Sequence, residues 1–189
     1  MSGTKTASAS ERLLDAAGEL FYAEGVHSVG IDRVIERAGV AKASLYNTFG
    51  SKESLVEAYL ARRHEGTRKR LEAAAGAATT PRERILAIFD SQARTIAEPG
   101  FRGCAFIAAS VEAPPDGGVS RASRAYRTWV RELFAASARE LGVADPDALA
   151  RRLRLLYDGA SIAGWMDRDR GAAADARAAA EALIDAAVR

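Results

Sequence analysis

Cysteine and histidine are scarce in this sequence. Among 189 residues there are one cysteine and two histidines. A single cysteine excludes a disulfide within the chain and any metal site built from several thiolates. The two histidines, His27 and His64, lie far apart and belong to no metal-ligand motif such as HExxH. We therefore expect neither a metal site nor a cofactor.

Long apolar runs are also missing. No segment approaches the roughly 18 consecutive apolar residues of a membrane-spanning helix. The first ten residues, MSGTKTASAS, contain one lysine and none of the apolar core that a secretion signal requires. We expect residues 1–10 to form a flexible tail and the protein to be cytoplasmic.

Proline and glycine are few, whereas alanine is abundant. The chain has 5 prolines, 16 glycines and, by our count, 42 alanines. Alanine has the highest helix propensity and is depleted in strands. Apolar residues recur three and four positions apart along nearly the whole chain, which is typical of amphipathic helices. The sequence therefore predicts an all-α protein of about nine helices and argues against a β-sandwich or barrel.

Two helix starts are marked by capping residues. Ser10 is the expected N-cap of the first helix, and Thr80-Pro81-Arg82-Glu83 combines a capping box with a proline at the first helical position. A short sixth helix is expected over residues 104–112 and the last one over residues 173–187.

Charge is nearly balanced overall and uneven locally. The chain carries 27 basic and 25 acidic residues, a net charge of +2, which identifies no polyanionic partner. Residues 1–60 contain 6 basic and 8 acidic groups, yet residues 28–52 have a local excess of two positive charges. The basic residues of that segment are Arg33, Arg37, Lys42 and Lys52.

Residues 31–49 have the pattern of a helix-turn-helix. Two short helices are expected on either side of Gly39, a residue that can take the left-handed backbone conformation of a tight turn. Val40, Leu45 and Phe49 would hold the second helix against the first. The side chains left pointing outward are Lys42, Ala43, Ser44, Tyr46, Asn47 and Thr48. The spacing alone also suits two ordinary helices of a bundle.

The residue identities in this segment are more specific evidence of function than the spacing of its apolar residues. Residues 39–55 read GVAKASLYNTFGSKESL and follow Ala38. This resembles the signature of the TetR (tetracycline-repressor) family: an AGV turn, a helix starting with small residues, an LY pair, an aromatic residue at the helix end, and SKE-x-L. The resemblance is close over residues 11–60. Beyond residue 60 it rests on the number and length of the helices and on Gly103-Cys104-x-Phe106.

The resemblance implies a DNA-binding regulator. It implies a helix-turn-helix head, residues 11–52, and a ligand-binding, dimer-forming body, residues 53–189. Lys42, Ala43 and Ser44 match positions that contact bases, and Tyr46, Asn47, Thr48 and Lys52 match positions that mostly contact phosphates. Arg33, from the local basic excess, completes the candidate DNA-binding set. The second helix of the helix-turn-helix, which begins near Lys42 and would contact the bases, is called the reading helix below. Ala41 departs from the family, whose members usually have serine or threonine as the N-cap of this helix.

The same resemblance implies a small-molecule effector in the body. Ligand cavities in helical bundles lie between helices and are lined by large side chains. The candidate lining residues are Phe89, Cys104, Phe106, Tyr126, Trp129, Tyr157, Ser161 and Trp165. The protein expected is a repressor that a bound small molecule releases from a palindromic operator.

Homodimerisation is expected through the last two helices. The helix near residues 146–166 has two apolar stripes and so needs two partners, its own core and a second copy of the chain. One stripe runs through Leu149, Leu153 and Leu156, and the other through Leu155, Ile162 and Met166. The candidate interface residues are Leu149, Leu153, Leu156, Ala160, Gly164, Leu183 and Ala187.

The sequence leaves two alternative functions open. A redox-responsive regulator acting through Cys104 is the first alternative. A helical enzyme is the second, and it is disfavoured because Cys104 has no histidine near it in sequence. Asp167 and Asp169 are neighbouring carboxylates at a helix end near Arg168 and Arg170, which is typical of a solvated helix end.

Overall fold

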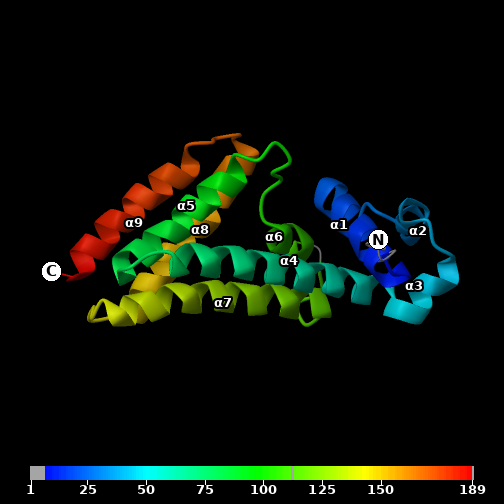
Figure 1. Cartoon of the computed structure of the whole chain (residues 1–189), viewed down its shortest axis with the longest axis horizontal. Coiled ribbons are helices and arrows are strands. Elements are labelled where there is room, and N and C mark those ends of the chain that lie inside the picture. Colours follow the sequence, from blue (N-terminus) through cyan, green and yellow to red (C-terminus); the bar gives the residue numbers. More distant parts are fainter. Residues whose placement is uncertain (1–6, 112, 189) are drawn as a thin grey trace, which may run out of the picture. The chain divides into compact units, whose positions relative to one another are not determined.

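The computed structural model describes residues 7–111 and 113–188. Within these ranges the chain forms nine α-helices and no strand (Figure 1). The helices are α1 (Ala9–Glu24), α2 (Ile31–Ala38), α3 (Lys42–Phe49), α4 (Lys52–Gly76), α5 (Pro81–Ile96), α6 (Ala105–Ser110), α7 (Gly118–Glu140), α8 (Pro146–Met166) and α9 (Ala172–Val188). The all-α prediction is confirmed.

Two predicted boundaries were wrong. Helix α1 begins at Ala9, and its N-cap is Ser8 rather than Ser10. Ser8 accepts a hydrogen bond from the Glu11 amide and donates its own amide to the Glu11 carboxylate, a complete capping box. Ser10 has no glutamate or glutamine three residues later and cannot form one. Helix α6 is shorter than expected, since it ends at Ser110; Glu112, in the predicted end, lies outside the described residues.

The capping box at the start of α5 is confirmed. Thr80 accepts from the Glu83 amide at 3.2 Å, and the Glu83 carboxylate accepts from the Thr80 amide at 3.0 Å. Glu83 also accepts the Thr79 hydroxyl at 2.7 Å. Together these hydrogen bonds lower the pKa of Glu83 from 4.5 to about 2, and the bond from the Thr79 hydroxyl has the largest effect.

This depressed pKa predicts a pH-dependent contribution of Glu83 to stability. A carboxyl whose pKa is lower in the folded chain stabilises the fold above its unfolded pKa and loses that effect as pH falls to the folded value. We expect the melting temperature of Glu83→Gln to lie below that of the wild type above about pH 5 and to meet it near pH 2. Thermal unfolding across this range measures the difference. Glu98→Gln, in an exposed turn, is the control and should show no such convergence.

The chain divides into two compact units. Unit 1 consists of the described residues up to Arg63 together with Ala105–Ser123, and unit 2 consists of His64–Cys104 together with the described residues from Arg124 onward. The division cuts α4 and α7, so each of these helices contributes its first part to unit 1 and its second part to unit 2. This is a division by compactness, and the predicted functional boundary at residue 52 stays a prediction.

Unit 1 has a core formed where α1, α2 and α3 meet. Leu13 of α1, Val34 of α2 and Leu45 of α3 are fully buried. The start of α4 joins this core, because the rings of Phe21 and Tyr59 are in edge contact with centroids 5.7 Å apart. The two short helices are therefore held by a long helix on either side in sequence.

The first turns of α4 also contact the start of α7 within unit 1. The Gly118 amide donates to a Glu53 carboxylate oxygen at 3.3 Å. A Cβ at residue 118 would lie 1.7 Å from the Glu57 carboxylate, so only glycine is accommodated here without displacing Glu57.

Unit 2 is a helical bundle in which α5, α8 and α9 pack together (Figure 1). Phe89 of α5 stacks on Phe134 of α7 with ring centroids 5.6 Å apart, and Tyr157 of α8 meets Phe134 edge to face at 6.3 Å. Gly164 of α8 lies against Ile96 of α5, where a Cβ would come within 2.7 Å of the Ile96 Cγ2. Aromatic side chains therefore fill the centre of this unit, and small residues allow its helices to approach.

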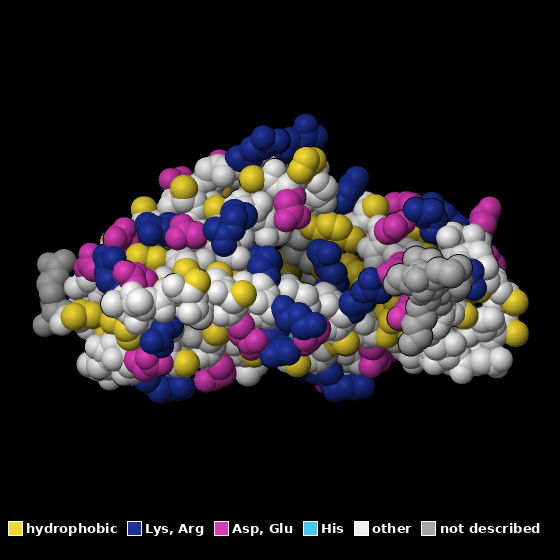
Figure 2. All heavy atoms as spheres, viewed as in Figure 1, with side chains coloured by type: hydrophobic (Ala, Val, Ile, Leu, Met, Phe, Trp, Pro, Cys, Tyr) yellow, Lys and Arg dark blue, Asp and Glu magenta, His cyan; other side chains and the backbone are white. Residues whose placement is uncertain are grey.

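The surface carries both signs of charge. Figure 2 shows lysine and arginine side chains interspersed with aspartate and glutamate over the face drawn. Among the described helices, none is long and apolar enough to cross a bilayer.

Candidate nucleic-acid interface

The turn between α2 and α3 depends on Gly39. Its φ of 61° and ψ of 43° lie in the left-handed region, which glycine enters without steric cost. The amide of Gly39 donates to Glu36 O at 3.1 Å and that of Val40 to Ile35 O at 3.3 Å, so the turn closes α2. Arg12 of α1 donates to Gly39 O at 3.2 Å and fixes the turn against the first helix.

Helix α3 is held by one buried side chain and exposes most of the others. Leu45 is fully buried, and Val40 and Phe49 at either end are half-buried. The predicted outward set is exposed at Lys42, Ala43, Tyr46, Asn47 and Thr48, whereas Ser44 is half-buried. This places six neighbouring side chains of the kinds that read bases and phosphates on one short helix.

The start of α3 has no side-chain cap. Ala41 occupies the N-cap position with φ −70° and ψ 148°, and no side chain accepts a hydrogen bond there. Alanine at position 41, where family members usually have serine or threonine, therefore leaves the N-terminus of α3 without a side-chain cap.

The basic side chains of the candidate set differ in their partners. Lys42 Nζ lies 2.9 Å from Asp32 Oδ1, and the Arg33 guanidinium donates two bonds to Glu24, at 2.6 and 2.9 Å. Hydrogen bonding to these carboxylates raises the pKa of Lys42 and of Arg33. Lys52, at the first position of α4, has no ion pair among the described residues.

Thr48 is the one candidate whose hydroxyl is already used. It donates to Ser44 O at 2.7 Å, one turn back along α3. A phosphate contact through this hydroxyl proton would require that bond to break.

Three comparisons with known proteins bear on this arrangement. The family model described as "Bacterial regulatory proteins, tetR family" matches residues 13–59. An uncharacterized HTH-type transcriptional regulator of Mycobacterium tuberculosis, Rv1255c, is 30% identical over 154 residues, which is 82% of this chain and 73% of the relative. SCO4454, a TetR-family transcriptional regulator from Streptomyces coelicolor, superposes with a TM-score of 0.91 at 36% identity, covering 96% of each chain. The chain belongs to the TetR family.

Family membership establishes the general role. This TetR-family chain is a DNA-binding transcriptional regulator and not an enzyme. A third relative, the HTH-type transcriptional activator FasR of Mycolicibacterium smegmatis, is 36% identical over 80 residues, 42% of this chain and 36% of the relative. Relatives of the chain therefore include a protein described as an activator.

The candidate effector residues of this TetR-family chain fall mostly in unit 2. Phe106 belongs to unit 1; the residues in unit 2 are Phe89, Cys104, Tyr126, Trp129, Tyr157, Ser161 and Trp165. Phe89, Tyr126, Tyr157 and Ser161 are buried, and Cys104 and Trp129 are half-buried. Trp165 is half-exposed and covers Gly103, where a Cβ would lie 3.2 Å from its ring.

Several of these residues share one polar cluster inside unit 2. The buried phenols of Tyr126 and Tyr157 hydrogen bond to each other, and burial raises the pKa of both. Gln92 donates to Tyr157 O at 2.6 Å and to the Ser161 hydroxyl at 2.8 Å. The Gln92 side-chain oxygen is buried and has no protein partner. Sequence reasoning missed Gln92, because a lone glutamine within α5 carries no pattern.

The His64 ring packs against two aromatic rings of unit 2. Its ring lies 5.5 Å from Tyr126 and 5.2 Å from Trp129, measured between centroids. Burial, with Arg68 nearby, lowers the pKa of His64.

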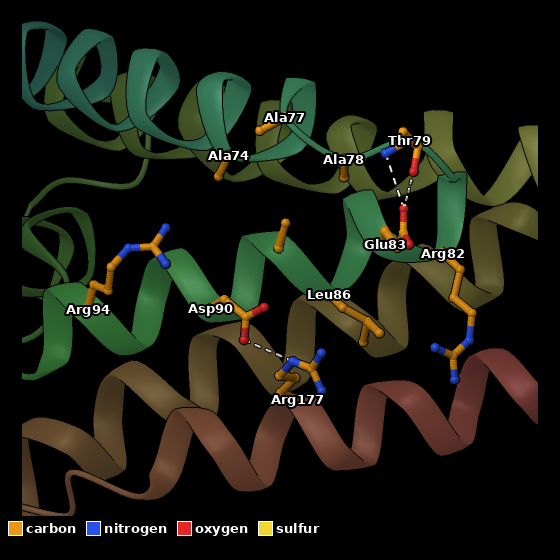
Figure 3. Close-up of a pocket in the computed structure, with 11 residues that line it drawn as sticks. Ala74, Ala77, Ala78, Thr79, Arg82, Glu83, Leu86, Asp90, Arg94 and Arg177 are labelled. Atoms are coloured by element: carbon orange, nitrogen blue, oxygen red, sulfur yellow. Dashed lines mark hydrogen bonds and ion pairs between the residues drawn. The ribbon is translucent and has the colours of Figure 1, made fainter.

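A separate groove of about 610 Å³ opens between α4, α5 and α9. Figure 3 shows its alanine-rich wall and the ion pair between Asp90 and Arg177, which are 2.8 Å apart. Its lining residues are Ala74, Ala77, Ala78, Thr79, Arg82, Glu83, Leu86, Ala87, Asp90, Arg94 and Arg177. None of the predicted effector residues lines it.

The predicted dimer residues differ in their exposure within the single chain. Leu149, Leu153 and Ala160 are at most 4% exposed because they pack into the core of their own chain, and Gly164 faces Ile96. Leu156, Leu183 and Ala187 are half-buried. The other stripe of α8 is the exposed one: Leu155 and Met166 are each 69% exposed and Ile162 is 44% exposed.

Proposed function

We propose that this TetR-family regulator is a homodimeric repressor that binds a roughly palindromic operator in the cytoplasm and is released by a small molecule. The observation that carries the DNA site is α3, an eight-residue helix held by Leu45 that presents Lys42, Ala43 and Tyr46 to solvent. A reading helix in the major groove contacts base edges with residues near its N-terminus. Lys42 and Ala43 are its first two residues, and Ser44 follows them.

The proposed division between base and phosphate contacts predicts two classes of variant. Tyr46→Ala and Lys52→Ala should weaken binding to every duplex, by about three- to tenfold, because phosphate contacts carry no sequence information. Lys42→Ala and Ser44→Ala should change which base is preferred at one or two positions of the half-site. Selection of bound duplexes from a random pool, followed by titration of the selected and of unrelated duplexes, measures both. Unchanged affinity and preference in all four variants would refute the site assignment.

The exposed stripe of α8 supports a second copy of the chain as the partner. Leu155, Ile162 and Met166 lie at i, i+7 and i+11, on the helix face opposite Leu149, Leu153 and Ala160. Gly159 lies within the stripe, and a Cβ there would meet open space. Ala178, Ala182 and Ala186 are exposed along α9, beside the exposed carboxylates of Asp175 and Asp185. An exposed apolar stripe such as that of α8 marks an interaction site.

The polar cluster of unit 2 supports an effector site there. A buried acceptor without a donor costs free energy, so the Gln92 oxygen favours any molecule that brings a donor to it. Tyr126, which hydrogen bonds to Tyr157 of this cluster, also contacts the rings of His64 and Trp129. A panel of small aromatic compounds, scored by loss of operator binding and compared between wild type and Gln92→Leu, tests the proposal. Release that is identical in both proteins would place the effector elsewhere.

A further inference from the structure

Three basic side chains of the helix-turn-helix are paired with acidic side chains of the same head. In the free head Glu24 holds Arg33, Glu19 holds Arg37 at 2.6 Å, and Asp32 holds Lys42. Only the last pair involves a residue of α3. Asp32 comes from α2, and both side chains are well exposed, 82% for Asp32 and 59% for Lys42.

We propose that Asp32 limits the DNA affinity of this head by competing with DNA for the Lys42 ammonium. The proposal rests on the assignment of Lys42 as a DNA contact. In the free protein the ammonium donates to Asp32 Oδ1 at 2.9 Å. To bind a guanine edge or a phosphate fully, Lys42 gives up that bond, and the Asp32 carboxylate is then left near the polyanion.

The competition follows from the chemistry of the two acceptors. A carboxylate and a phosphate oxygen are both anionic acceptors for a lysine ammonium. Counterion release drives protein–DNA affinity when cations from the protein replace salt at the phosphates. A lysine already neutralised by its own chain contributes less to that release, because its own carboxylate must be displaced as well.

The exposure of the pair sets the size of the effect. Exposed ion pairs are weak, so Asp32 reduces affinity modestly and does not block binding. We expect Asp32→Asn to bind a random-sequence duplex about two- to fivefold more tightly than wild type. We also expect its plot of log affinity against log salt to be steeper by up to about one unit.

Glu36→Gln is the matched control. Glu36 is exposed on the same helix, and its removal changes the head charge by the same amount without touching Lys42. A gain at Asp32 beyond that of Glu36→Gln is therefore specific to the ion pair, whereas equal gains would show a general effect of charge and overturn the proposal.

A double-variant cycle shows whether the effect passes through Lys42. In a Lys42→Ala background Asp32→Asn should gain no more than Glu36→Gln does. A gain that persists in full would show that Asp32 acts on the phosphates directly, and weaker binding by Asp32→Asn would show that it positions Lys42 for DNA; either result overturns the competition. In the protein without DNA, the NMR-measured pKa of the Lys42 ammonium should fall in Asp32→Asn, and an unchanged value would show that the pair does not form.

These results separate the inference from the function it rests on. Wild-type binding to duplexes selected from the random pool tests the function without any variant. Wild-type binding together with no gain in Asp32→Asn would overturn the inference alone. No binding of the wild type to any duplex would overturn both. Unfolding curves of each variant confirm that the compared heads are folded.

Discussion

Leu155→Arg is expected to make the proposed dimer monomeric. Leu155 is 69% exposed at the beginning of the apolar stripe of α8, with Ile162 two turns further on. In a symmetric dimer each residue of the interface occurs twice, so a single substitution brings two arginines into the same apolar contact. An unpaired charge in a desolvated interface costs far more than the loss of one leucine contact.

Operator binding should fall with the loss of the dimer. Two linked heads bind two half-sites with an effective local concentration that single heads lack, and losing it weakens binding by about 10²- to 10⁴-fold. Sedimentation measures the mass of the protein, and titration with the selected operator measures its affinity. Val111→Arg, at an apolar side chain 76% exposed outside the stripe, is the control and should leave the mass unchanged. A Leu155→Arg protein that sediments as a dimer with normal affinity would contradict the proposed interface.

Leu45→Ala is expected to cost about 2–5 kcal/mol of unit 1 stability and to abolish operator binding. Leu45 is the only fully buried side chain of α3. A helix of eight residues is not stable in water without tertiary contacts, and α3 lacks a side-chain cap as well. The reading helix therefore depends on this one side chain for its place in the head.

The neighbouring residue provides the contrast. Tyr46→Ala removes a half-exposed ring from the same helix and should change stability by less than about 0.5 kcal/mol while weakening DNA binding. Hydrogen exchange of the α1–α3 amides measures the stability of the head separately from that of unit 2. Equal exchange protection in Leu45→Ala and wild type would disprove the role assigned to Leu45.

The elements that sequence predicted well are those fixed by local chemistry. Gly39 has the left-handed backbone that the turn demands, and Thr80 and Glu83 form the capping box that their spacing indicated. Such features depend on residues within four positions of one another. Ser8, another local cap, was missed only because Ser10 lies nearer to the first apolar residue.

The features that sequence did not predict depend on which helix faces meet. Both stripes of α8 are apolar, and only the packing of α8 against α9 and α5 leaves Leu153 buried and Leu155 exposed. The charge count of residues 28–52 gave an excess of two, but it did not show that Lys42 is neutralised by Asp32, ten residues earlier and on another helix. The isolated Gln92 became visible only beside Tyr157 and Ser161.

The three ion pairs of the head bear on how fast an operator is found. Electrostatic attraction acts at every position of a genome, whereas base contacts act only at the operator. Arg33, Arg37 and Lys42 are each paired with a carboxylate of the same chain, so we expect their charges to add less to the attraction that acts everywhere. Affinity differences between related complexes lie mostly in the dissociation rate. We therefore expect each stay on an unrelated sequence to be shorter than it would be with these three cations unpaired, so that one molecule could inspect more of the chromosome in a given time.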